Sequence, residues 1–526
     1  MDGRAELRAP GVARVDTGRV TAPQRLALAA ATMGSFVAGL DATAVNVALP
    51  AIREDLGGGL AAQQWVANGY LLTLGALILV GGSLGDLFGE RRVFSLGVAG
   101  FGVVSLLCAV APSVEVLIAG RALQGVFGAL LTPSALAVIV SAFPDTEERG
   151  AAIGSWTAWS GIGVIIGPLA GGWLTDLVSW RWIFGVNVPF VLVTLALVRA
   201  GVPAREPGGR RPRIDWLGAV LTTIALAGPV LALIRQPAVG WGSAQVWVPG
   251  LGGVLLFALF LAHERRTPEP MLPLGLFRRR NFAVTNLETL FMYGGLSGAF
   301  FFLVLFLQQV AGYSAVVAGL ATMPPSLVLF ALSRRIGRLS ARLGPRAFMA
   351  GGPLLGAVGL LGLLRVDADP HYVVDVLLPL LVFSLGLAVC VAPLTATVLA
   401  DADAANAGIA SGVNNAVARV AGLLAVAAIG AVVAGQFGAR LDRELGGREL
   451  SGPAAAAVED ARRQTLARLE PRQAGPEVAR AVEEASVHAF RVGVGISAAL
   501  LALGGVLGAV GIRNQPQRSS PSARAA

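Results

Sequence analysis

The sequence predicts an all-α polytopic membrane protein with fourteen transmembrane helices, arranged as two six-helix pseudo-repeats plus an inserted helix pair. Hydrophobic residues make up 55% of the 526 residues and charged residues only 14%, against about 25% in soluble domains. A transmembrane helix needs about 20 predominantly apolar residues. The segments that qualify begin near Leu26, Trp65, Val93, Val116, Gly150, Trp182, Ile214, Val246, Phe282, Ala315, Ala347, Val374, Gly408 and Ala489.

Arginine is distributed unevenly between the predicted loops. Alternate loops carry groups of arginines, and the short loops between them hold only Arg53, Arg181, Arg235 and Arg365. Because basic loops stay on the cytoplasmic side, both tails, 1–25 and 513–526, are expected in the cytoplasm. The net charge of +9 is assigned to this orientation, and no nucleic-acid-binding face is expected.

An internal repeat divides the chain. GSLGDLFGER at Gly82–Arg91 matches GRLSARLGPR at Gly337–Arg346, except that Ala341 stands where the first copy has Asp86. The match predicts six-helix halves at 26–200 and 282–512, an inserted helix pair at 214–262, and a partly helical outer connection at 436–488. Parallel repeats of this kind place a binding site between the halves, near the middle of the membrane.

One carboxylate, Asp41, lies inside the first predicted span, in the stretch LDATAVNVALP. A charge there costs at least ~2.5 kcal/mol, so it should face protein or water and have a function. Arg121 in the fourth span is at a matching depth, about 12 Å from the outer face against ~13 Å for Asp41. Pairing would relieve the cost of both charges and could hold a transferable proton. The alternative is that Asp41 is a fixed hydrogen-bonding group with Thr43 or backbone.

Glu288 and Arg419 are candidates for a second pair, in the other half. Glu288 follows Arg280 by about eight residues, and Arg419 lies at a comparable depth from the cytoplasmic side. The two residues could form an ion pair like that of Asp41 and Arg121, unless the Glu288 side chain extends by about one helical turn to the membrane interface.

Glycines mark two further motifs. In GSLGDLFGERR they permit a tight turn between helices, beside charged side chains that either form a gate or only meet the membrane surface; the residues are Gly82, Asp86, Gly89, Arg91 and Arg92. In the fifth span, glycines around a proline favour close helix packing; they are Gly163, Gly167, Pro168, Gly171 and Gly172.

GSLGDLFGERR resembles the signature loop of the major facilitator superfamily. LDATAVNVALP, QWVANGYLL at Gln64–Leu72, RALQG at Arg121–Gly125, GPLAGG, WRWIFGVNVP at Trp180–Pro189 and QQVAGYSAVVAGLATMPPSL at Gln308–Leu327 are similar to its fourteen-helix drug:proton antiporter branch. The resemblance implies an exporter of lipophilic or cationic drugs or natural products in a bacterial plasma membrane, driven by the proton gradient. It makes Asp86 part of a charge clasp at the gate. The second copy of the motif has Ala341 in place of the acid, so this clasp is asymmetric. In the same family, GPLAGG favours export.

Polar and aromatic residues within the spans are expected to line a substrate cavity, unless they serve in packing or at the interface; they are Phe36, Asn46, Tyr70, Gln124, Trp156, Trp159 and Tyr293. The three histidines lie in loops or at a helix edge, so no metal site, cofactor or catalytic set is expected. The partners expected are a small amphiphilic molecule, protons and the bilayer. Open alternatives are a dedicated exporter of one metabolite or antibiotic, and an uptake symporter.

Overall fold

The computed structural model describes residues 20–203, 214–268, 270–400, 407–446 and 450–514. Fourteen helices in these ranges are long and apolar enough to cross a membrane, and the described residues contain no strand, so the predicted fold class is confirmed. Most of the two predicted cytoplasmic tails lies outside the described residues.

The N-terminal half comprises six spans, of which the last is interrupted at Val186. They are α1 (Ala22–Leu56), α2 (Leu60–Phe88), α3 (Glu90–Ala109), α4 (Val114–Ala142), α5 (Thr146–Leu177), and α6 (Trp182–Gly185) with α7 (Asn187–Gly201). The inserted pair follows as α8 (Trp216–Val239) and α9 (Ala244–Glu264).

The C-terminal half also comprises six spans. They are α10 (Arg280–Gln309), α11 (Ala315–Ala321) with α12 (Pro324–Leu343), α13 (Arg346–Gly362), a π-helical turn (Tyr372–Leu377) with α14 (Leu378–Ala400), α15 (Ala407–Leu445) and α18 (Pro476–Gly511). Short 3-10 turns at Leu274–Arg278 and Leu363–Arg365 complete it. The tenth span, predicted as continuous from Ala315, is broken around Met323 because two prolines follow.

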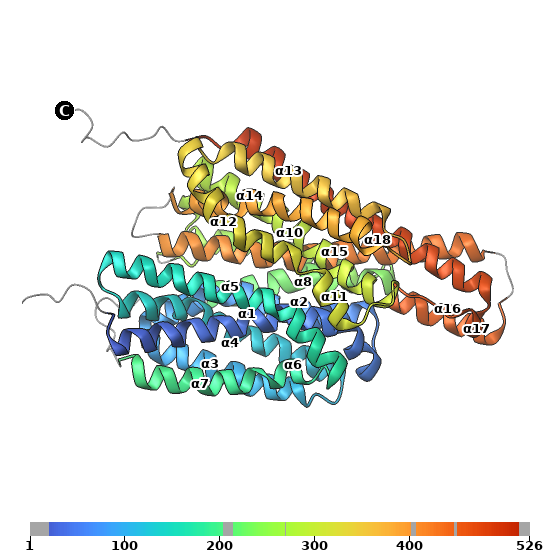
Figure 1. Cartoon of the computed structure of the whole chain (residues 1–526), viewed down its shortest axis with the longest axis horizontal. Helices are drawn as coiled ribbons and strands as arrows, with labels where there is room; N and C mark the ends of the chain where they lie inside the picture. Colours follow the sequence, from blue (N-terminus) through green and yellow to red (C-terminus); the bar gives the residue numbers. More distant parts are fainter. Residues whose placement is uncertain (1–19, 204–213, 269, 401–406, 447–449, 515–526) are drawn as a thin grey trace, which may run out of the picture.

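The two halves lie side by side as separate bundles (Figure 1). We call the end where α1 begins and α18 ends the terminal end, and the opposite end the cap end. The arginine-rich turns lie at the terminal end, since it is there that α2 meets α3 and α12 meets α13. The sparse arginines, such as Arg53 and Arg365, lie at the cap end.

The predicted outer connection at 436–488 is more helical than expected. The spans α15 and α18 have 39 and 36 residues, so at about 1.5 Å per residue each exceeds the ~30 Å hydrocarbon core. Their projecting ends pack with α16 (Gly452–Gln464) and α17 (Pro471–Ala474) into a helical cap (Figure 1).

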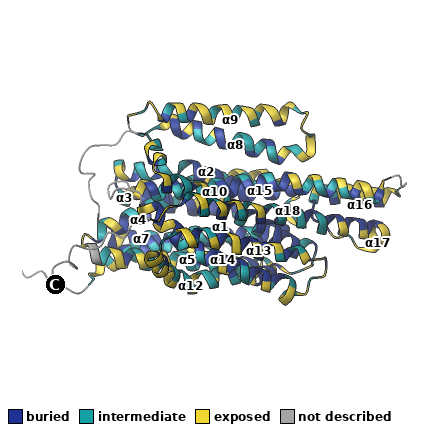
Figure 2. Ribbon diagram, turned by 90° about the horizontal axis from the view of Figure 1, so that it is seen from above, coloured by how far each residue is buried: buried dark blue, intermediate teal, exposed yellow. Residues whose placement is uncertain are grey.

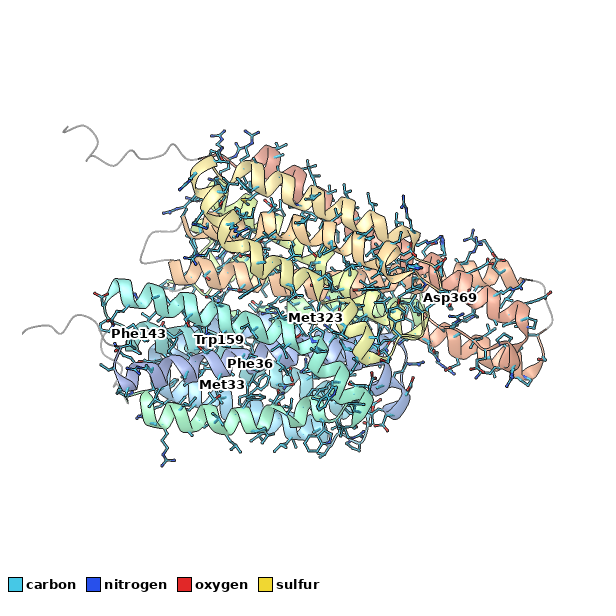
Figure 3. The ribbon with its side chains drawn as sticks, viewed as in Figure 1. Met33, Phe36, Phe143, Trp159, Met323 and Asp369 are labelled. Carbon is cyan, nitrogen blue, oxygen red and sulfur yellow. The ribbon has the colours of Figure 1, made fainter. Side chains whose placement is uncertain are left out.

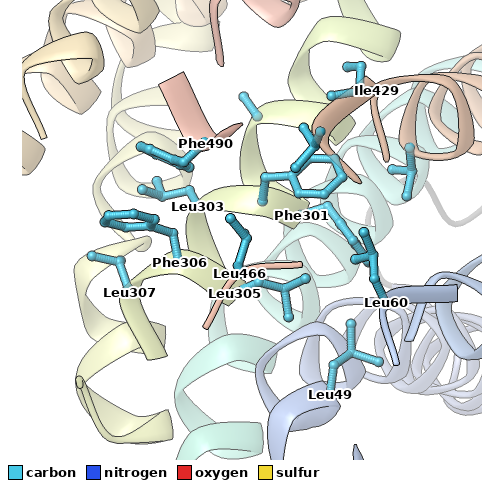
Figure 4. Packing of buried hydrophobic residues seen from close by; sticks show 14 of the residues in the cluster. Leu49, Leu60, Phe301, Leu303, Leu305, Phe306, Leu307, Ile429, Leu466 and Phe490 are labelled. Atoms are coloured by element: carbon cyan, nitrogen blue, oxygen red, sulfur yellow. The ribbon is translucent and has the colours of Figure 1, made fainter. Parts of the chain in front are cut away.

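The main apolar core joins the two halves near the cap end. Leu49 and Leu60 of the N-terminal half belong to one buried cluster with Phe301 and Phe306 of α10 (Figure 4). Phe306 stacks on Phe490 of α18 with ring centroids 4.2 Å apart. The inserted pair lies outside this core, where α8 packs on α2 and α15 while α9 is largely exposed (Figure 2).

Candidate functional site

Asp41 is completely buried in the N-terminal half, where three donors converge on its carboxylate. Arg121 Nη1 lies 2.6 Å from Oδ2, while Gln124 Nε2 and Asn187 Nδ2 each lie 3.0 Å from Oδ1. Ser105 Oγ accepts further bonds from both amides, at 2.9 and 3.3 Å. The carboxylate of Asp41 accepts all three of these bonds, which suits an ionised carboxylate. The network ties together α1, α3, α4 and α7.

Arg121 is also buried, and each of its neighbours helps to compensate its charge. Its Nε donates to the carbonyl of Val66 at 3.2 Å, and its Nη1 also donates to Gln124 Oε1 at 2.5 Å. The guanidinium lies over the rings of Tyr70 and Phe184, at 4.6 and 5.7 Å from their centroids. A buried ion pair is tolerated when its remaining donors and acceptors are satisfied in this way.

The structure therefore confirms the contact between Asp41 and Arg121 that their matching depths predicted. The alternative partner is wrong, because the Thr43 hydroxyl lies near the carbonyls of Gly39, Leu40 and Val164 instead. Two partners, Ser105 and Asn187, were not predicted. Asn187 lies within the WRWIFGVNVP motif, so a polar residue near the end of this apolar motif was the available signal.

The predicted mirror pair in the C-terminal half is not formed. Glu288 is fully buried, and its Oε1 lies 3.3 Å from Cys390 Sγ, which is the only bond to it among the described residues; Oε2 has no partner there. Arg419 lies elsewhere, on the face of α15 that meets α2. Equal depth did not place the two side chains together, because they project from their helices in different directions.

The signature turn between α2 and α3 has the geometry expected for its glycines. Gly89 has a φ of +88°, and its repeat partner Gly344 between α12 and α13 has a φ of +87°. The repeat predicted from sequence is thus present in backbone conformation. Asp86 is exposed and forms no ion pair with Arg91 or Arg92, so the predicted clasp is not formed here.

The glycines of the fifth span allow close helix contacts. A Cβ at Gly163 or Gly167 would lie 2.5 Å from the Phe36 carbonyl or 2.8 Å from the Leu40 carbonyl, both on α1. One at Gly171 would lie 2.8 Å from Ala44. Gly172 faces the other half, where a Cβ on it would lie 2.6 Å from the Ala315 carbonyl. The helix is continuous through Pro168.

A cavity of about 250 Å³, which we call the central cavity, lies where α10, α14 and α15 of the C-terminal half face α2, toward the terminal end. Leu71 comes from α2, and the other lining residues come from α10, α14 and α15. The polar ones are Tyr293, Ser297, Thr395, Ser411, Asn414, Asn415 and Arg419. Of the predicted cavity residues, Tyr293 alone lines this space.

A second, more apolar cavity of about 470 Å³ lies between α1, α5 and α7. Phe36 and Trp159 line it with Met33, as their neighbouring labels in Figure 3 indicate. Trp156 instead donates from Nε1 to Ser35 Oγ at 2.9 Å, which joins α5 to α1. Asn46 lines neither cavity, and Tyr70 and Gln124 belong to the buried network.

At the cap end the halves are joined by hydrogen bonds. Gln308 Nε2 donates to the Val47 carbonyl at 3.0 Å, and the Asp176 carboxylate accepts from the amides of Ala315 and Val316 at 3.1 and 2.8 Å. Together with the shared core, these bonds close the cap end. The cavity therefore lies on the opposite side of the closed region.

The cap is fixed to the C-terminal half by Arg468. Its Nη1 donates to Asp369 Oδ1 at 2.9 Å and to the Val310 carbonyl at 3.3 Å. The hydrogen bond from Arg468 lowers the pKa of Asp369 below its ordinary value. No group of three or more potential metal-ligating side chains occurs within the described ranges.

Two bundles of six membrane spans, with a buried ion pair in one and a cavity between them, define a multi-pass membrane transporter. The model of the major facilitator superfamily matches residues 31–426, and the chain belongs to that family. It is 39% identical over 409 residues to the puromycin resistance protein pur8 of Streptomyces alboniger, covering 76% of this chain and 80% of that protein. It is 34% identical to the multidrug resistance protein Stp of Mycobacterium tuberculosis, covering 80% and 78%.

The fold is also similar to that of a bacterial homologue of the human lysosomal transporter Spinster, solved in an inward-facing and unoccupied conformation. The TM-score is 0.62 at 17% identity, covering 93% of this chain and 98% of that one. At this identity the similarity concerns the fold alone.

Proposed function

We propose that the protein is a proton-driven antiporter that exports lipophilic drugs or natural products by alternating access. The observation that carries the proposal is the Asp41–Arg121 pair, a buried carboxylate and guanidinium 2.6 Å apart in a transporter fold. Similarity to resistance proteins supports export over uptake. The proposed location is the bacterial plasma membrane, with the terminal end and both tails in the cytoplasm.

In this orientation the cap end faces outward and is closed, while the central cavity lies on the cytoplasmic side. The arrangement corresponds to an inward-facing state that is ready to take substrate from the cytoplasm. The Asp176 and Gln308 bonds would have to break before the cavity could open outward. The glycines at 163, 167, 171 and 172 with Pro168 are proposed as the packing hinge, and Asp86 with Arg91 and Arg92 as the gate turn.

Protonation of Asp41 would change the network that joins four helices. A neutral carboxyl attracts Arg121 less strongly and brings a donor of its own. Asn187 Oδ1 is buried without a partner among the described residues, and half a turn of its amide would aim this acceptor at the new O–H. A proton would thereby loosen α1 from α4 while the charge of Arg121 stays compensated by Gln124 and Val66. Glu288 is kept as a second candidate proton site.

The test is Asp41→Asn in everted vesicles energised with a proton gradient. The substitution keeps size and polarity but removes the titratable charge. We expect it to abolish proton-driven uptake of puromycin and of a panel of lipophilic drugs, with normal amounts of protein in the membrane. Asp369→Asn, the same change at an exposed loop carboxylate, is the matched control. Undiminished exchange by Asp41→Asn would overturn the assignment.

A dedicated exporter of one antibiotic is the second candidate, favoured by the similarity to a protein named for resistance to puromycin alone. A susceptibility panel in a strain that lacks its own pumps, with and without an uncoupler, separates the two. Resistance to one chemical scaffold indicates the dedicated exporter, and resistance to several indicates a multidrug exporter.

A further inference from the structure

Arg419 places a positive charge deep in the membrane, on the wall of the central cavity. It lies twelve residues into α15 from Ala407, or about 18 Å at the helical rise. The hydrocarbon core is about 30 Å thick, so the guanidinium is near its middle. Beside it, a Cβ at Gly75 of α2 would lie 3.2 Å from the Arg419 Cβ, so the glycine leaves room for the arginine where α2 and α15 meet.

No carboxylate in the described ranges neutralises this charge. Arg419 has no ion pair or hydrogen bond there, and no acidic residue lines the cavity. The two nearest intramembrane carboxylates by depth are engaged elsewhere, Asp41 by Arg121 and Glu288 by Cys390. An uncompensated arginine at this depth is costly and indicates a function.

The remaining lining residues provide hydrogen bonds and apolar contact. Asn414 is held in place, because its Nδ2 donates to Thr289 Oγ1 at 2.8 Å and to Asn286 Oδ1 at 3.2 Å. Tyr293 and Leu71 add apolar surface to the lining. The cavity thus combines a single fixed cation with an amphipathic wall.

We propose that the cavity recognises the anionic group of an amphiphilic organic molecule, such as a carboxylate, phenolate or enolate, through Arg419. The guanidinium presents a planar fork of donors that matches two oxygens of such a group. The apolar body would lie against Tyr293 and Leu71. This assignment rests on the proposed transport function for the nature of the occupant, and it replaces the expected cationic substrate with an anionic one.

Binding of three compounds with one apolar body tests the charge preference. 2-Naphthoate, 2-naphthamide and 2-naphthylmethylamine are anionic, neutral and cationic at pH 7, and each is titrated into the purified full chain by calorimetry in a chloride-free buffer without carboxylate ions. We expect naphthoate to bind at least about tenfold more tightly than the other two. Arg419→Gln should remove this preference and Arg419→Lys should retain part of it, while Arg365→Gln, an exposed arginine at the cap end, should leave it unchanged.

Several results would overturn the proposal. These are equal binding of the three compounds, preference for the amine, no binding of naphthoate up to 1 mM, or a preference that survives Arg419→Gln. Chloride is then added to test for an inorganic-anion site. Loss of naphthoate binding at a physiological chloride concentration would also overturn the assignment to an organic substrate.

Transport of the same compounds into everted vesicles separates this proposal from the proposed function. Proton-driven movement of all three at equal rates would leave the exporter intact and overturn the anion preference. Arg419-dependent binding of naphthoate without any proton-driven movement would support the anion site and contradict the antiporter.

Discussion

The two halves each place a carboxylate and an arginine within the membrane, but they arrange them in opposite ways. In the N-terminal half Asp41 and Arg121 bond directly, and three further polar residues complete the network. In the C-terminal half the only hydrogen-bond partner of Glu288 among the described residues is Cys390, while Arg419 faces the central cavity. The two halves of the repeated fold therefore hold their charges differently. Asp41 and Arg121 bond to each other, whereas Arg419 is left to face the cavity.

The difference shows what pairing does to a buried charge. The arginine that has a carboxylate is completely enclosed, whereas the arginine without one lines a cavity that water and solutes can enter. The paired residues suit a proton-dependent switch, and the unpaired one suits recognition. The following changes test this contrast.

Arg121→Met should have the largest effect on stability, because it leaves Asp41 as an unpaired charge in a dry site. We expect a loss of about 3–5 kcal/mol in the free energy of unfolding, measured by SDS titration in mixed micelles. Arg419→Met, the matched change in the other half, should cost less than about 1 kcal/mol. Adding Asp41→Asn to Arg121→Met should recover much of the loss, and equal costs for the two arginines would contradict the contrast.

The two repeated turns should both resist a side chain. Gly89→Ala and Gly344→Ala force a Cβ into backbone conformations that suit glycine, at about 1–3 kcal/mol each. Gly344→Ala should cost more, since its Cβ would also lie 2.4 Å from the Asn514 side chain. The same titration measures both. Gly154→Ala, in a helix with open space around the new atom, is the control, and a neutral Gly344→Ala would show that the turn is not constrained.

Glu288→Gln should be tolerated better than Asp41→Asn. Glutamine keeps the shape and an acceptor for Cys390, so the expected cost is below about 1 kcal/mol, with proton-driven transport retained at more than half the wild-type rate. Vesicle transport and unfolding are measured on the same preparations. Complete loss of coupling in the Glu288 variant would show that both halves carry proton sites.

The exposed pair Arg468–Asp369 should have the smallest effect, and it should depend on pH. Because the hydrogen bond from Arg468 lowers the pKa of Asp369, its contribution is present above the ordinary aspartate value and disappears as pH falls through the lowered one. The difference in Tm between wild type and Asp369→Asn should therefore be constant from pH 5 to 8, in the range about one unit or more above ~3.9, and shrink in stronger acid. A difference that grows on acidification would contradict this sign.

Sequence reasoning predicted the spans well, because membrane thickness and hydropathy determine where they lie. It also predicted the Asp41–Arg121 contact, since both residues had a single plausible depth. Depth along a helix says nothing about rotation around its axis. That limitation explains why Ser105 and Asn187 were missed and why Glu288 was assigned to Arg419 instead of Cys390.

The extent of the cap was also underestimated. Residues 436–488 are rich in alanine and arginine, so the sequence predicted only a partly helical connection there, yet a helix that continues past the membrane no longer needs apolar residues on every face. Leu466 and Val482 are buried in the cap, so tertiary packing beyond the bilayer supports these extensions.

The contact between α2 and α15 runs from Gln64 to Leu79 on α2 and from Gly412 to Gly430 on α15. At one end Gln64 Nε2 donates to the Val426 carbonyl at 2.7 Å, and toward the other a Cβ at Gly412 would lie 3.0 Å from Leu79. The inserted helix α8 packs along the same line, touching both α2 and α15. The three helices therefore pack along one common line. On the side away from α8 the halves meet where α5 contacts α11, so we expect a molecule bound between α5 and α11 to hinder their separation more than one bound at α8.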